Sequence, residues 1–577
     1  MKEGIPGDLI KYPRTGHSIT FVDQITIYEK VLKAIERAYH ASWVRGEQRR
    51  NYDDLILRPQ HSSPPACCQK ANLLNTLNFV DAYKVLGYNE SLYGDFLSVL
   101  RNDPHLVARC LVLGEAQNQE AMHTAAHTIF ASVYANGLLP EDETHILNLL
   151  KHLIELQLAT SENPRRQLRH GSCAFSQIYR AYVEMLPQSK VFLTAALHQP
   201  IIQLLMEDEL FLDIDPSKAA VRFPPEERLR RFGEEGTPEY AAALGKYRAW
   251  TISKLVKITN RFLESIKEAM NCFPWSLSWL VRILYEVLLS AKVTEMREVS
   301  AICVDLIFGL FLCPALVTPE PHGICDAPIS HISRFNLMQV AQILQVLAMS
   351  RWETPDPRLN DLYSQFDKEV VASLLDNIVE QEGSESPPCL VGYNNPLLGL
   401  ERSSFLCPET HLTSLISFIQ TVLPEFPEDD ESRKEWETLL GRIKPPPPAL
   451  QPSNISPTTA NSNTTSPSVT PSKKNLLGRV KSNRNRSSKS QCEGDGDSVK
   501  SGEDTVSITT NSSNGGITHS GSATGLGNNT EEGDVVPPIL EYDRVLVISL
   551  RGGGSCDCPG LMAEEKVLFT LQVEFTT

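Results

Sequence analysis

The chain has 577 residues, more than one hydrophobic core usually organises, so we expect more than one structural unit. Its 70 Asp and Glu residues outnumber 54 Lys and Arg residues, and the net charge of −16 argues against a nucleic-acid-binding or anionic-lipid-binding surface spread over the whole molecule. The 13 cysteines are scattered without paired CxxC spacing, which favours reduced thiols in a cytoplasmic protein.

Apolar residues recur at helical spacing from residue 27 to about residue 440, and period-2 alternation is rare. We therefore predict an all-α fold, with an N-terminal helical region over residues 1–140 and a multi-helix domain over residues 141–440. An acidic stretch with several Pro and Gly, residues 207–239, is interpreted as an exposed insertion. The expected helices cover residues 27–48, 79–86, 92–101, 117–135, 145–158, 174–186, 245–270, 275–291, 299–312, 333–349, 359–380 and 409–423.

The most apolar stretch, residues 301–317, is expected to be a buried helix. It is too short to span a bilayer comfortably, it contains Asp305, and Pro314 interrupts it. Any membrane role would then depend on recruitment.

Residues 441–577 are rich in Ser, Thr, Asn and Gly, and such a composition predicts a disordered tail. A basic run at residues 473–489 is either a solvated linker or a phosphorylation-tuned site for acidic lipid or protein. Residues 545–550 and 567–575 have strand-like patterns, which by themselves would form a marginal hairpin at best.

Signatures of a self-contained enzyme are missing. The chain has no HExxH, no Walker A sequence, no GxSxG and no strand-borne GxGxxG. His123 and His127 are four residues apart on an expected helix and could share a metal, but no Glu stands in HExxH register, so a satisfied surface pair is the other interpretation. We expect no cofactor and no metal of the chain's own.

Two segments stand out together. Residues 163–175 carry Arg165, Arg166 and Arg169 between a Pro and a Gly, and we predict a cationic loop between two long helices. Residues 308–320 form an apolar helix that ends at Pro314 and Ala315.

These segments resemble the Ras GTPase-activating domain family. Residues 168–174, with the sequence LRHGSCA, are similar to the family's arginine-finger sequence, and the Pro314-Ala315 pair with Pro319 is similar to its proline-alanine sequence. Residues 324–328 and 334–339 extend the likeness, which covers about residues 147–378. The resemblance implies a multi-helix Ras-GAP-like domain with an N-terminal helical extension.

The resemblance also implies an activity. A GTPase activator inserts an arginine into the nucleotide site of a Ras-superfamily GTPase, and the partner GTPase holds the GTP and Mg²⁺. Arg169 occupies the finger position. The expected GTPase-binding residues are Arg165, Arg166, Arg334, Asn336 and Met338, and the expected finger support consists of Leu310, Pro314 and Ala315.

One departure from the family pattern concerns Leu310. The family places an arginine there, four residues before the proline, where it braces the finger loop; leucine cannot donate hydrogen bonds to that loop. This departure is compatible with weak, selective or absent activation, and the alternative function is a non-catalytic GTPase-binding scaffold or adaptor. A helical repeat scaffold without a GTPase partner is a further alternative, although no regular period emerges.

Within the family, the N-terminal helical region, residues 163–175 and residues 545–550 more closely resemble members that act in endocytic traffic and carry a VPS9 exchange domain for Rab-type GTPases. That likeness implies a Ras- or Rab-family partner, endocytic adaptors, a peripheral endosomal location and no nucleic acid. It also implies that the chain is a shortened form that ends before the VPS9 domain.

Overall fold

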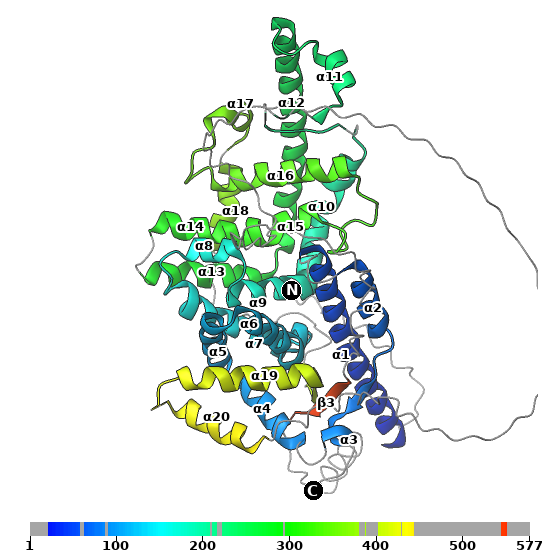
Figure 1. The fold of residues 1–577 in the computed structure, drawn as a ribbon, viewed down its shortest axis with the longest axis vertical. Helices are drawn as coiled ribbons and strands as arrows, with labels where there is room; N and C mark the ends of the chain where they lie inside the picture. Colours follow the sequence, from blue (N-terminus) through cyan, green and yellow to red (C-terminus); the bar gives the residue numbers. More distant parts are fainter. Residues whose placement is uncertain are drawn as a thin grey trace, which may run out of the picture. The chain divides into compact units, whose positions relative to one another are not determined.

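The computed structural model describes residues 21–57, 63–86, 90–207, 210–215, 218, 222–291, 295–367, 369–379, 387, 402–428, 430–443 and 544–550. All of these residues belong to one compact unit of the chain. The predicted all-α architecture is confirmed, because helices make up nearly all of the described elements (Figure 1). The predicted tail lies outside the described residues except for residues 441–443, where α20 ends, and residues 544–550.

The N-terminal helical region begins with one long helix. Asp103 and Asn118 each cap the helix that follows them, since their side chains accept hydrogen bonds from backbone N–H groups in its first turn. The elements in this region are α1 (Phe21–Leu57), α2 (Pro64–Leu74), β1 (Phe79–Asp81), α3 (Ala82–Leu86), α4 (Glu90–Asn102), α5 (Pro104–Gln117) and α6 (Gln119–Thr128).

Helices of the larger helical domain pack around one continuous hydrophobic core that also takes in α4, α5 and α6. Within it α5 packs on α7, and α10 packs along α12 (Figure 1). The elements are α7 (Pro140–Leu153), α8 (Pro164–His170), α9 (Ala174–Met185), α10 (Pro187–Leu205), α11 (Pro225–Phe232), α12 (Pro238–Ala269), α13 (Trp275–Ser290), α14 (Met296–Val304), α15 (Cys313–Val317), α16 (His331–Met349), α17 (Asn360–Tyr363), α18 (Glu369–Val379), α19 (Glu409–Val422) and α20 (Glu431–Arg442).

A three-stranded sheet corrects two expectations. Its strand order is β1-β3-β2, with β2 at Ser404–Pro408 and β3 at Val545–Ser549. Strand β3 pairs in parallel with β1 and antiparallel with β2. The helix predicted over residues 79–86 is therefore wrong at residues 79–81, where pairing with β3 overrides the local pattern. The strand predicted at residues 545–550 is confirmed, but as the buried centre of a sheet formed with partners far away in the sequence.

Three segments that were expected to be ordinary α-helix are π-helical: Ile129–Val133, Ile154–Leu158 and Asp305–Leu312. A π-helical turn adds a residue to the helical repeat, so it rotates the side chains that follow, and such turns are frequent at functional sites. The last two segments both contact α8. The predicted helix over residues 359–380 is also interrupted, because α17 and α18 are separate.

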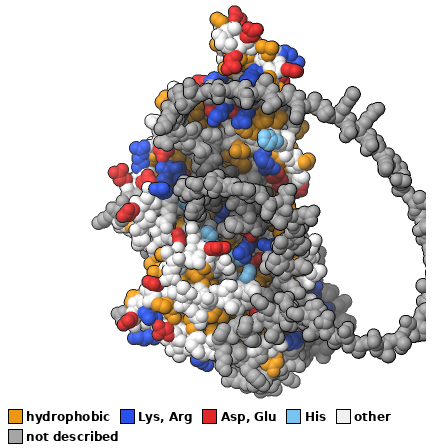
Figure 2. Space-filling model, viewed as in Figure 1, with side chains coloured by type: hydrophobic (Ala, Val, Ile, Leu, Met, Phe, Trp, Pro, Cys, Tyr) orange, Lys and Arg blue, Asp and Glu red, His pale blue; other side chains and the backbone are white. Residues whose placement is uncertain are grey.

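The apolar run is buried as predicted. Residues Met296–Val317 are long and apolar enough to cross a membrane, but most of their side chains are buried within the domain. The segment predicted as an exposed insertion contains α11, and Phe223 and Phe232 form a small apolar cluster with α12 there. On the face drawn in Figure 2, Lys and Arg side chains lie beside Asp and Glu side chains where grey atoms do not cover the surface.

A buried charge cluster joins the C-terminal segments to the helical core. Asp142 of α7 is fully buried and accepts hydrogen bonds from Arg101 and, at 3.1 Å, from Arg402. Arg402 also donates to the Ser132 carbonyl at 2.9 Å. Loss of one member of such a cluster leaves another buried charge without compensation, which is costly. The cluster therefore fixes the position of Arg402, just before β2.

Because β3 fills the centre of the sheet, we predict that Leu546→Asp lowers the free energy of unfolding by at least about 3 kcal/mol. Leu546 is fully buried, so the new carboxylate would lose its hydration. Urea unfolding of the full chain, followed by circular dichroism, measures the effect. Met206→Asp is the control, because Met206 is 82% exposed. Equal stability of the two variants would show that the strand is not part of the fold.

Candidate functional site

The arginine-rich segment is a short helix, not the predicted loop. The Asn163 side chain accepts a hydrogen bond from the Arg166 N–H at 3.0 Å, and Pro164 takes the first helical position. Gly171 ends α8 with φ of 71°, a conformation that glycine adopts without steric cost. The proline and glycine therefore mark the start and the stop of a helix here. The loop prediction is correct only for residue 163 and residues 171–173.

The first turn of α9, just after this loop, is held by two side chains. Glu115 Oε2 accepts from the Ala174 N–H at 2.9 Å, and Gln157 Oε1 accepts from the Phe175 N–H at 3.0 Å. Gln157 Nε2 also donates to Glu115 at 2.6 Å. A carboxylate at a helix N-terminus satisfies backbone donors and interacts well with the helix dipole. Gln157 reaches this position from the π-helical segment Ile154–Leu158.

Loop carbonyls are bound as well. His123 Nε2 lies 2.8 Å from the Ser172 carbonyl, which can only accept, so this nitrogen carries the proton. Gln177 Nε2 donates to the Gly171 carbonyl at 2.8 Å. The backbone after Arg169 is thus fixed by side chains from α6 and α9.

The guanidinium of Arg169 forms a two-point ion pair with Asp305. Arg169 Nε lies 2.8 Å from Asp305 Oδ2, and Arg169 Nη2 lies 3.1 Å from Asp305 Oδ1. The Arg169 side chain is 47% exposed, whereas Asp305 is 2% exposed. Asp305 begins the π-helical segment Asp305–Leu312, which leads directly into Pro314. A buried carboxylate therefore holds a surface arginine from behind.

Arg165 shares the same carboxylate. Its Nε donates to Asp305 Oδ2 at 2.8 Å, and its Nη1 donates to Glu353 at 2.6 Å. The Arg165 side chain is 13% exposed, so it is mostly buried behind α8. Arg166 is exposed on the same helix.

The residues expected to support the finger lie in two consecutive helical segments, Asp305–Leu312 and α15. The π-helical segment with Leu310 contacts α8, and α15, which contains Pro314 and Ala315, continues from it. Leu310 packs against the main core and Ala315 is fully buried, while Pro314 is exposed. Leu310 has no donor side chain. Another residue of the same segment, Asp305, accepts hydrogen bonds from the Arg169 guanidinium.

The three expected GTPase-binding residues on α16 have different surroundings. Arg334 pairs with Glu320 and donates to the Val317 carbonyl at 2.7 Å, at the C-terminal end of α15. Asn336 is buried; it accepts from the Leu212 N–H at 2.8 Å and donates to the Leu210 carbonyl at 2.9 Å. Met338 is half-buried against the main core. Asn336 thus holds the segment at residues 210–212 inside the fold.

His123 and His127 do not form a pair. His123 contacts Ser172, whereas the His127 Nε2 lies 3.3 Å from Glu47 Oε1. Burial, together with Arg50 and His411, lowers the pKa of His127 well below its usual value. The interpretation as a satisfied surface pair is therefore wrong, because α1 and α19 cover His127.

Sequence reasoning missed the partners that hold the arginine segment: Asp305, Glu115 and Gln157. One signal was available, since Asp305 is a lone charge in an apolar run, and a buried charge requires a partner. For Glu115 and Gln157 no comparable signal existed, because polar residues in amphipathic helices usually face solvent.

The helical region around Arg169 matches a known family. Residues 149–349 match the RasGAP family, GTPase-activator protein for Ras-like GTPase. The matched range contains Arg169, Asp305, the Pro314-Ala315 pair and all of α16. This match agrees with the family that the sequence resemblance predicted for about residues 147–378.

Particular relatives extend beyond this domain. The chain is 38% identical over 541 residues to GTPase-activating protein and VPS9 domain-containing protein 1 of Xenopus laevis, covering 93% of this chain and 34% of that protein. It is 41% identical over 458 residues to the Homo sapiens protein of that name, covering 79% and 31%. Receptor-mediated endocytosis protein 6 homolog of Drosophila pseudoobscura pseudoobscura is 31% identical over 412 residues, covering 70% and 22%. The chain spans about a third of the length of the first two relatives.

We predict that Glu115→Ala loosens the loop behind Arg169. The Ala174 N–H loses its acceptor and Gln157 loses a partner, a change expected to destabilise the first turn of α9 by about 1–2 kcal/mol. Amide hydrogen exchange at Ala174 and Phe175 should become faster. Glu120→Ala, which removes an exposed carboxylate on neighbouring α6, is the control. Unchanged exchange in Glu115→Ala would show that the carboxylate does not hold this turn.

Proposed function

We propose that the chain accelerates GTP hydrolysis by a Ras-superfamily GTPase in endocytic traffic, with Arg169 as the arginine finger. The RasGAP match at residues 149–349 and the names of the relatives support this proposal. The single observation that carries the assignment to Arg169 is its setting: a half-exposed guanidinium at the end of α8, next to a loop whose backbone is fixed.

The chemistry requires a cation supplied from outside the GTPase. Negative charge spreads over the phosphoryl oxygens in the transition state, and a positioned guanidinium stabilises that charge in a desolvated site. Arginine suits this task because its fork is planar and permanently charged. Such a finger contributes about 10³ to 10⁵ in rate.

Asp305 gives Arg169 a second state. While Nε and Nη2 face the carboxylate, the charge of Arg169 is largely neutralised, so phosphate oxygens must compete with Asp305 for the guanidinium. Arg165 makes this exchange less costly, because it continues to pair with Asp305 when Arg169 leaves. In this proposal Asp305 restrains the finger until a GTPase binds.

Replacing Arg169 is the direct test. In single-turnover GTP hydrolysis with the full chain, screened over Ras- and Rab-family GTPases, we expect Arg169→Ala to lose about 10³-fold of the acceleration. Arg169→Lys should fail nearly as completely, because an ammonium cannot reproduce the fork.

The control for that experiment is Arg230→Ala on α11. The Arg230 side chain is 77% exposed, and its ion pair with Glu227 of the same helix is long, at 3.7 Å. Its activity should equal that of the wild type. If wild type and Arg169→Ala accelerate GTP hydrolysis equally, Arg169 has no part in the mechanism.

Asp305→Asn tests the restraint. An asparagine at residue 305 keeps one acceptor oxygen but loses the charge, so Arg169 is held less tightly and the single-turnover rate should rise several-fold. Thermal unfolding of the same variant reports whether the buried site still folds. A slower reaction in a folded Asp305→Asn protein would show that the carboxylate positions Arg169 for catalysis instead of restraining it.

A second candidate function is a GTPase-binding scaffold that does not activate its partner. The two-point pairing of Arg169 with Asp305, and Leu310 at the position of the family's bracing arginine, favour this alternative. A complex with a GTP-loaded GTPase whose hydrolysis rate stays at its basal value, with wild type and with Asp305→Asn alike, would establish it.

Partners and location are parts of the proposal. The GTPase belongs to the Ras or Rab family, endocytic adaptors are further partners, and the chain acts in the cytoplasm at endosomal membranes to which it is recruited. The basic run at residues 473–489, interpreted as either a solvated linker or a phosphorylation-tuned site for acidic lipid or protein, lies outside the described residues.

A further inference from the structure

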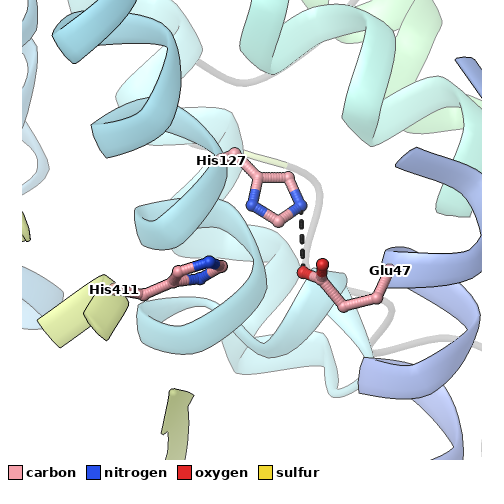
Figure 3. Close-up of side chains that lie close together, drawn as sticks. All are labelled: Glu47, His127 and His411. Carbon is pink, nitrogen blue, oxygen red and sulfur yellow. Dashed lines mark ion pairs between the residues drawn. The ribbon is translucent and has the colours of Figure 1, made fainter. Parts of the chain in front are cut away.

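Three side chains from separate parts of the sequence converge beside α6. Figure 3 shows Glu47 of α1, His127 of α6 and His411 of α19 directed toward one another from three helices. One ligand atom from each lies within 4.8 Å of the other two. The two imidazole rings are nearly perpendicular, with centroids 6.2 Å apart. Neutral imidazoles and a carboxylate are typical ligands of zinc.

Within the described part of the chain, one carboxylate oxygen of buried Glu47 has the 3.3 Å ion pair with His127 but no hydrogen bond. The residue is 3% exposed, and its Oε1 has no hydrogen-bond donor among the described residues. Burial raises the pKa of Glu47 to about 7. Buried polar atoms without partners are rare in folded proteins, and a bound ion can satisfy such an atom in place of a hydrogen-bond donor.

The spacing of one ligand pair, His127 and Glu47, also suits a metal. The 3.3 Å between His127 Nε2 and Glu47 Oε1 is longer than a charge-assisted hydrogen bond, which is about 2.7–2.9 Å. Two ligands that each lie about 2.0–2.1 Å from a tetrahedral zinc ion are about 3.3–3.4 Å apart. The pair can therefore bind one ion without a change in its separation.

We propose that Glu47, His127 and His411 bind one divalent transition-metal ion, with zinc as the best fit and water as the fourth ligand. Two imidazoles disfavour calcium and magnesium, which prefer oxygen ligands. This site is separate from Arg169 and does not depend on the proposed activity.

Arg50 is the competing partner. Its Nη1 lies 3.1 Å from His127 Nδ1, and in that arrangement Arg50 donates to Nδ1 while Nε2 carries a proton toward Glu47. Metal binding at Nε2 places the proton on Nδ1, so Arg50 must turn away. Arg50 is partly exposed, which gives it room to do so. The metal-bound state and the hydrogen-bonded chain are thus alternatives that an experiment can separate.

The site would join the N-terminal extension to the GTPase-activating domain. A cleft of about 190 Å³, lined in part by Gly46, His123, His127, Gly171 and Ser172, connects α1 with the loop after Arg169. His123, one helical turn before His127, holds the Ser172 carbonyl. A metal that fixes α1, α6 and α19 would therefore stiffen the support behind the arginine segment.

Zinc binding by the full chain tests the proposal. After treatment with EDTA and gel filtration, the chain is titrated with Zn²⁺, and bound metal is counted by mass spectrometry; Co²⁺ absorption then reports a tetrahedral site. We expect one ion per chain and a rise in the thermal midpoint, because the ion binds the folded state. His411→Ala and Glu47→Gln should each weaken binding at least about 10-fold.

His152→Ala is the matched control. The ring centroids of His152 and His105 are 5.0 Å apart, and His152 Nδ1 lies 2.9 Å from Glu155 Oε2. The substitution therefore removes a histidine that has similar neighbours but lies outside the proposed site. Its zinc affinity should equal that of the wild type. Equal affinity of His411→Ala and wild type would overturn the proposal. A thermal midpoint that does not change with Zn²⁺ or EDTA, but is lower in Glu47→Gln, would also overturn the proposal. That pattern would indicate that Glu47 acts only through the hydrogen bonds that link Arg50, His127 and Glu47.

Discussion

The structure of the site depends on one buried carboxylate between two arginines. Asp305 is almost fully removed from water, so its charge must be compensated by nearby donors. Arg165 supplies that compensation from the buried side and Arg169 supplies it from the surface. Because one carboxylate is shared by two cations, the outer arginine can be exchanged for another interaction while the inner arginine remains. The Arg169–Asp305 contact can therefore be broken while the Arg165–Asp305 contact is kept.

The backbone around Arg169 is held independently of this ion pair. Glu115 and Gln157 bind the first amides of α9, and His123 binds the Ser172 carbonyl. The loop that the family would brace with an arginine at the position of Leu310 therefore has other supports here. They come from α5, α6 and a π-helical turn, so the N-terminal helices contribute directly to the site.

Segments near the C-terminal end of the described chain complete the same unit. Arg402 reaches Asp142 in the core, and β3 pairs with strands from both ends of the helical region. A shortened chain that ended after α20 would leave β1 and β2 without their common partner. Mixed β pairing of this kind unites segments more than four hundred residues apart, and no local sequence pattern announces it.

The periodic apolar residues by themselves determined the all-α fold class and most helix positions, because amphipathic helices must bury one face. The residues around Arg169 determined the family resemblance. Only the tertiary structure decided which polar side chains became partners. Asp305 meets Arg169 from a different helix, Asn336 turns into the fold, and Glu47 meets His127 across α1 and α6. Such pairings depend on how helices are placed in three dimensions, and hydrophobic periodicity specifies which face is buried but not which neighbour covers it.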